Sequence, residues 1–162
     1  MSRFVLISLC ALFAGCGFHL REQAQLPASL QHVHVQIDPA DLLGRDLTAA
    51  LQRSGATIEE KAENVAVLRI PVSSIKVETL SVGATARVRE YTMTDRVEIE
   101  AVDATGHVIL PRQAIELSRD YTFDETQALG VAAQETELRK QLGRDMVQAI
   151  LRRLAALARN QP

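Results

Sequence analysis

Residues 87–103 read RVREYTMTDRVEIEAVD, and their side chains alternate between polar and apolar types. The apolar positions are Tyr91, Met93, Val97, Ile99 and Ala101. The polar positions between them are Glu90, Thr92, Thr94, Arg96, Glu98 and Glu100. A period of two residues is typical of a β-strand with one buried and one solvated face. We therefore predict a long strand here, with an acidic and polar outer face.

The segments on either side of this strand also predict strands. Residues 65–82 are rich in β-branched side chains, and their alternation changes phase at Ser73-Ser74, beside Pro71, where we expect a bulge. A connecting loop is expected over residues 80–86. Asp103-Ala104-Thr105-Gly106 is a good hairpin turn. The returning strand carries its apolar residues on one parity: Ile115, Leu117, Tyr121 and Phe123.

A strand and a helix are predicted ahead of these three strands. Residues 32–38 alternate and indicate a short, half-buried strand. Asp38-Pro39 suits the N-cap and first position of a helix. Ser54-Gly55 suits its end, because glycine readily takes the left-handed cap conformation. The apolar face of this helix is Leu43, Leu47, Ala50 and Leu51.

The C-terminal region predicts a long amphipathic helix that begins near Ala132. Its apolar positions recur at steps of three and four residues: Leu138, Leu142, Met146, Ala149, Ile150, Leu154 and Leu157. The order of elements is thus strand, helix, three strands, helix (β-α-β-β-β-α). It predicts an α+β fold, a two-layer α/β sandwich whose four-stranded sheet is covered by two helices.

The N-terminus has the layout of a secretory signal that ends at a cysteine. Arg3 precedes a short apolar run that closes with Leu12-Phe13-Ala14-Gly15-Cys16, too short to span a bilayer. The expected organisation is a cleaved lipoprotein signal peptide over 1–15, a lipid-anchored tether over 16–30 and a single domain over 31–162. Cys16 would carry the lipid; an ordinary cleaved signal with an incidental cysteine is the alternative. Gly17 stands where Asp would mark inner-membrane retention, which favours the outer membrane.

Composition excludes several classes of protein. Removal of residues 1–15 leaves 147 residues, the size of one domain with its own core. Cys10 lies in the signal and Cys16 would be acylated, so no disulfide is expected. The net charge of −2 gives no reason to expect nucleic-acid binding, although fifteen of the eighteen basic residues are arginine. A bias towards arginine codons explains that excess as well as a binding role does.

No constellation of catalytic residues is evident. His32 and His34 share one strand face, but no third ligand can be placed nearby, so no metal site is predicted. Phosphate loops, nucleophile elbows and paired-cysteine motifs are absent from the sequence. Arg87 and Arg89 lie at the entrance of the long strand, where two guanidinium groups can bind phosphate. The alternative is that these two arginines belong to an ordinary charged surface and bind no ligand. We expect neither an enzyme nor a cofactor.

Several short motifs, spread over the whole mature chain, resemble the LptE family of lipopolysaccharide-assembly lipoproteins. These are Cys16-Gly17-Phe18-His19-Leu20-Arg21, Leu26-Pro27, Glu90-Tyr91, Arg119-Asp120-Tyr121-Thr122-Phe123-Asp124, Asp145-Met146 and Arg152-Arg153-Leu154. The resemblance implies a non-catalytic outer-membrane lipoprotein, without a cofactor, that sits as a plug in the lumen of the LptD β-barrel. It also implies assistance to the folding of that barrel and binding and delivery of lipopolysaccharide.

The sequence departs from this family at its usual basic positions. Residues 80–86 carry no basic residue, and the region near Val131 is apolar. Arg87 and Arg89 are the closest substitutes for a lipopolysaccharide contact. Two other classes stay open at this point: a lipid-anchored periplasmic adaptor or pilot protein of another envelope machine, and a small periplasmic hydrolase.

Overall fold

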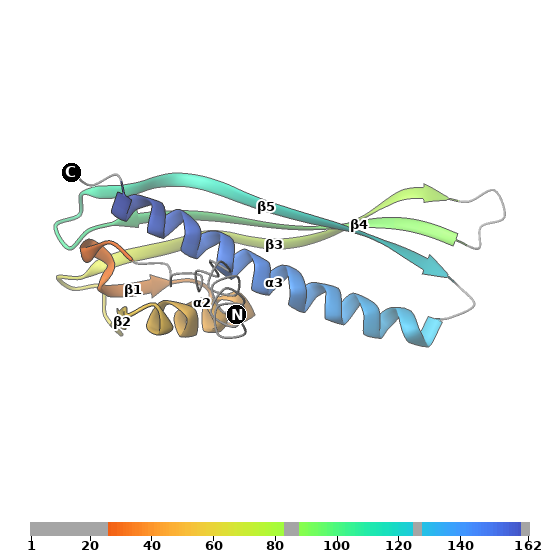
Figure 1. Cartoon of the computed structure of the whole chain (residues 1–162), viewed down its shortest axis with the longest axis horizontal. Helices are drawn as coiled ribbons and strands as arrows, with labels where there is room; N and C mark the ends of the chain where they lie inside the picture. Colours follow the sequence, from red (N-terminus) through yellow and green to blue (C-terminus); the bar gives the residue numbers. More distant parts are fainter. Residues whose placement is uncertain (1–25, 83–87, 125–127, 160–162) are drawn as a thin grey trace, which may run out of the picture.

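A computed structural model describes residues 26–82, 88–124 and 128–159. The elements follow in this order: η1 (Ala28–Leu30), β1 (His32–Gln36), α2 (Leu42–Arg53), β2 (Thr57–Ile58), β3 (Ala66–Val82), β4 (Val88–Val102), β5 (Val108–Asp124) and α3 (Ala128–Arg159). Three long strands and the long helix α3 run along the length of the molecule, while β1, β2 and α2 lie at one end (Figure 1).

The described strands form one mixed sheet in the order β2-β1-β3-β4-β5. β1 is parallel to both of its neighbours, and β3, β4 and β5 are antiparallel. The predicted α+β sandwich is confirmed, but the sheet has five strands in place of the expected four. β2 has two residues, too few to show an alternating pattern. It exists because the backbone N–H of Thr57 donates to the carbonyl of Gln31, just before β1, at 2.7 Å, and that of Glu59 donates to Val33, within β1, at 3.0 Å.

The core lies between the sheet and the two helices, and it uses the residues that the periodicities predicted. Both helices bury most of the apolar faces named above, although Leu138 and Leu157 are only half-buried. The apolar side of β4 is also buried from Met93 to Ala101, and Tyr91 is half-buried. Gly44 of α2 packs closely on the preceding segment, since a Cβ built there would lie 2.6 Å from Ile37 Cγ2. Leu26 and Leu30, from the segment expected to be a tether, also pack against this core.

Both helices begin at other residues than predicted. The N-cap of α2 is Asp41, whose Oδ1 accepts a 2.9 Å hydrogen bond from Leu43 N. The predicted cap, Asp38, instead closes a turn, in which its carboxylate accepts from Ala40 N. α3 begins at Ala128, four residues before the expected start. The predicted end of α2 is confirmed, because Gly55, which follows this helix, has a left-handed φ of +91°.

Irregular pairing in β3 lies close to, but not at, the predicted bulge. The register shifts between Arg69 and Val72, around Pro71, in place of Ser73-Ser74. A second shift lies between Thr79 and Ser81. β3 continues to Val82, so part of the expected loop belongs to the strand. The hairpin turn at residues 103–106 is confirmed.

Candidate functional site

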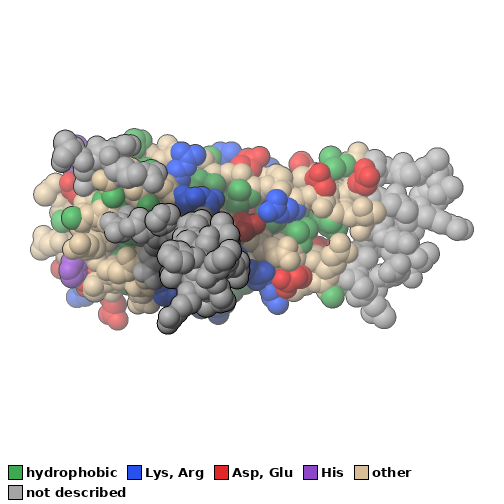
Figure 2. Space-filling view, viewed as in Figure 1, with side chains coloured by type: hydrophobic (Ala, Val, Ile, Leu, Met, Phe, Trp, Pro, Cys, Tyr) green, Lys and Arg blue, Asp and Glu red, His purple; other side chains and the backbone are tan. Residues whose placement is uncertain are grey.

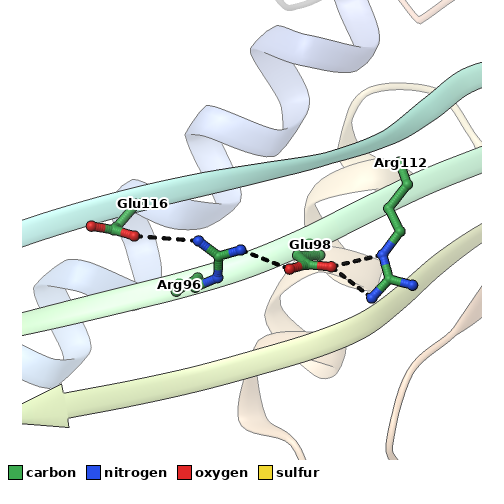
Figure 3. A network of polar contacts seen from close by, with 4 residues as sticks. All are labelled: Arg96, Glu98, Arg112 and Glu116. Atoms are coloured by element: carbon green, nitrogen blue, oxygen red, sulfur yellow. Dashed lines mark hydrogen bonds and ion pairs between the residues drawn. The ribbon is translucent and has the colours of Figure 1, made fainter.

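One face of the sheet carries polar side chains and lies on the side of the strands away from α3 (Figure 3). The alternation of β4 produces this division. Met93, Val97 and Ile99 are buried under the helices, together with Asp95 of the same parity, and the even-numbered residues from Thr92 to Glu100 point the other way. We call this polar side of β3, β4 and β5 the open face.

At the centre of the open face, Glu98 holds two arginines. Arg96 Nη2 donates to Glu98 Oε1 at 2.8 Å, and Arg112 donates to Glu98 Oε2 through Nε at 2.7 Å and Nη2 at 2.6 Å (Figure 3). Arg96 also pairs with Glu116 at 3.6 Å. Hydrogen bonds from Arg96, and then from Arg112, hold the pKa of the Glu98 carboxyl below its usual value. The charges in the middle of this face therefore neutralise one another.

Polar contacts continue along the open face beyond this cluster. Towards β1, Arg69 donates to Gln36 at 3.1 Å and to Glu100 at 3.4 Å. In the other direction, one cross-strand hydrogen bond joins Thr92 to Asp120 at 2.7 Å, and another joins Thr94 to Ser118 at 3.0 Å. The open face is thus a long surface of exposed donors and acceptors, suited to hydrogen bonding with a polar wall.

On the helix side of the sheet, a groove of about 530 Å³ lies between α3 and the end of β5 and is open to solvent. Tyr91 and Tyr121 stack beside it, with ring centroids 5.5 Å apart. Burial, and then the nearby Glu135, raise the pKa of Tyr121. The described lining residues include no histidine, cysteine or serine: Asp120, Tyr121, Thr122, Gln134, Glu137, Leu138 and Gln141. These lining residues therefore contain no Ser-His or Cys-His pair.

Charged side chains of both signs are interspersed on the helix side of the molecule (Figure 2). Two of them join the layers, because Arg119 of β5 pairs with Asp145 of α3 at 3.1 Å. No helix in the described ranges has both the length and the apolar character needed to cross a bilayer.

The residues singled out from the sequence are only partly described. Cys16 and Arg87 lie outside the described residues, and Arg89 is described by its backbone alone, which pairs with Val82 and Phe123. His32 and His34 both turn towards Glu59: Nδ1 of His32 lies 2.9 Å from its carboxylate, and Nδ1 of His34 lies 2.9 Å from its carbonyl oxygen. Among the described residues, no three potential ligands gather around a metal position.

The sequence reasoning missed Arg112, although a signal for it exists. Counting outward from the pair Val102–Val108 places Arg112 opposite Glu98. Two irregularities in the β4–β5 register move Ala114 into that position, but the long arginine side chain still reaches Glu98.

Comparison with known proteins gives concordant matches in sequence and structure. The sequence profile of the LptE family, described as lipopolysaccharide-assembly, matches residues 30–154. An LPS-assembly lipoprotein LptE from Photorhabdus laumondii is 30% identical over 154 residues, which cover 91% of this chain and 84% of the relative. The solution structure of a lipoprotein B from Nitrosomonas europaea superposes with a TM-score of 0.73 at 32% identity, covering 86% of this chain and 91% of that one. The crystal structure of the rare lipoprotein B from Shewanella oneidensis superposes with a TM-score of 0.70 at 26% identity, covering 80% of this chain and 97% of that one.

Proposed function

This chain belongs to the LptE family, and we propose that it acts as a non-catalytic outer-membrane lipoprotein in lipopolysaccharide transport to the cell surface. Its partner in this role would be an LptD-type β-barrel. The observation that carries the proposal is the family match over residues 30–154, which spans every described strand and the greater part of α3.

We further propose that the domain fills the lumen of that barrel as a plug. The lumen of a large outer-membrane barrel is polar, whereas its lipid-facing side is apolar. The open face suits such a wall, because the charges at its centre are already paired within the chain. Glu98 is satisfied by two arginines, so contact with a polar lumen needs no oppositely charged patch there. Exposed hydroxyl, carboxylate and guanidinium groups remain for hydrogen bonds across the interface.

A lipid on Cys16 would hold the domain at the membrane beside the barrel. Each buried methylene contributes about 0.8 kcal/mol, and two acyl chains suffice for stable anchoring. Tethering also raises the effective concentration of one partner near the other. Replacing Cys16 by Ser should move the protein from the membrane to the soluble periplasmic fraction, as fractionation would measure. A Cys10→Ser variant is the matched control and should stay with the membrane.

The test of the whole proposal is affinity isolation of the tagged chain from detergent-solubilised outer membranes. A stable one-to-one complex with an LptD-type barrel, identified by mass, is expected. Recovery of a different envelope machine in place of the barrel would instead assign the chain as an adaptor or pilot protein, and would overturn the translocon role.

For the lipopolysaccharide contact we propose Arg87 and Arg89. Guanidinium groups bind phosphate through paired hydrogen bonds, and lipopolysaccharide carries phosphates. The double change to Glu should weaken binding to purified lipopolysaccharide. The same reversal at Arg152 and Arg153, both exposed on α3, is the matched control. Unchanged binding in the Arg87/Arg89 variant would remove these two residues from the proposal.

A further inference from the structure

β3 leaves a long part of one edge unpaired. It pairs with β4 from Val67 to Val82, but β1 lies beside it only from Ala66 to Arg69 (Figure 1). Between residues 72 and 82, the edge away from β4 pairs with no other strand in the described parts of the chain. We call this stretch the free edge. Unpaired backbone N–H and C=O groups in a row are a template for another strand.

The side chains of the free edge differ on the two faces of the sheet. Ile75 and Val77 lie on the helix side and are 40% and 38% exposed, although they are large and apolar. Lys76 and Glu78 lie on the open face, are exposed and are the only charged residues between 72 and 82. The free edge therefore combines unpaired backbone, uncovered apolar surface and one charge of each sign.

We propose that the free edge pairs with the free edge of a second copy of this chain, antiparallel and centred on Val77. A two-fold axis at Val77 places Lys76 opposite Glu78 of the second copy, and Glu78 opposite its Lys76. Directly opposite residues in an antiparallel pair share one face, and opposite charges there attract. The same axis brings the exposed Val77 side chains together and sets Ile75 opposite Thr79.

The charges select this register. An axis at Val77 opposes Lys76 and Glu78 in both directions, whereas an axis at residue 76 would oppose two lysines and an axis at residue 78 would oppose two glutamates, which is unfavourable. A slip of one residue would place apolar side chains against charged ones on the wrong face. An unrelated strand would have to supply the same complementarity by chance.

This inference does not rest on the proposed function, since it uses β3 alone. The two-fold contact is isologous, meaning that the same surface serves both copies, as in most homodimers. It would cover the free edge in chains that are not engaged with another protein.

A single cysteine at the axis tests the contact. The purified full chain carrying Val77→Cys, free of other proteins, should form a disulfide-linked homodimer on mild oxidation, because opposite Cβ atoms on paired strands lie about 4.5–5.5 Å apart. Ala114→Cys, exposed on β5 and remote from the free edge, is the matched control and should stay monomeric. Equal cross-linking at both positions would overturn the proposal. So would a Val77→Cys chain that stays monomeric under the same oxidation.

Charge reversal tests the register. Lys76→Glu alone and Glu78→Lys alone should each weaken self-association of the purified full chain about tenfold by sedimentation, because each creates two like-charge pairs. The double swap, Lys76→Glu with Glu78→Lys, should restore it. Lys61→Glu, at an exposed site outside β3, is the control for charge alone and should have no effect. A double swap that stays as weak as the single variants, or an unmodified chain that is monomeric throughout, would overturn the proposal.

Discussion

Replacing Asp95 by Asn should stabilise the protein at neutral pH and leave its stability in acid unchanged. Asp95 lies on the apolar side of β4 between Met93 and Val97, and it is 5% exposed. Burial, and then the carboxylate of Asp41, raise its pKa from 3.8 to about 6. The folded protein therefore favours the neutral acid, and an amide of nearly the same shape imitates that form at every pH.

The size of the effect follows from the two pKa values. Below pH 3.8 the carboxyl is protonated in both the folded and unfolded states, so it adds no pH dependence. Between 3.8 and about 6 the unfolded chain loses the proton and the folded chain keeps it, so the free energy of unfolding falls as pH rises. At about 1.4 kcal/mol per pH unit, the full interval is worth about 3 kcal/mol.

Chemical denaturation of the parent and of Asp95→Asn, measured from about pH 3 to pH 8, would test this reasoning. The two proteins should agree in acid, diverge between about pH 4 and 6, and differ by up to about 3 kcal/mol above that range. Asp46→Asn is the matched control, because its side chain is 57% exposed; the expected change is below about 0.5 kcal/mol. Parallel pH curves for the parent and the Asp95 variant would show that the carboxyl is not held neutral.

Three further substitutions test other parts of the structure by their unfolding midpoints. Gly44→Ala should cost about 1–3 kcal/mol, because its Cβ would lie 2.6 Å from Ile37 Cγ2; a midpoint like that of the parent would show that Ile37 moves freely. Asp41→Ala should cost about 1 kcal/mol through loss of the cap hydrogen bond to Leu43 N, whereas Asp41→Asn should retain most of it. Glu98→Gln should lower the midpoint slightly at neutral pH. That difference should vanish in acid, as the lowered pKa of Glu98 requires, and a constant difference would argue against charge pairing.

The sequence predicted best the elements in which a periodic pattern repeats many times. The alternation over residues 87–103 and the three- and four-residue steps of α3 each repeat many times, so a few exceptions do not hide them. Short signals were less decisive. Asp38 and Asp41 are both good caps, and local rules cannot choose between them; the turn that Asp38 closes, and the close packing of Gly44 on Ile37, place the start of α2 at the second.

The candidate site shows the same division. Parity identified the polar side of β4, including Arg96 and Glu98. It did not identify Arg112 as the second arginine on Glu98, because that contact depends on cross-strand register and on two irregularities in β4 and β5. The strand β2, the second neighbour of β1, was missed for a related reason, since its two residues are identified by backbone hydrogen bonds to the segment of β1.

By itself, the amino-acid sequence determined which residues face the core, the α+β class and the order of the long elements, because these follow from periodicities within single segments. Only the tertiary structure decided how much of the β3 edge stays unpaired, which charges meet on the open face and how deeply Asp95 is buried. Each of these depends on the distance between segments far apart in the chain. Such distances are set by packing and register, and no local pattern of residue types encodes them.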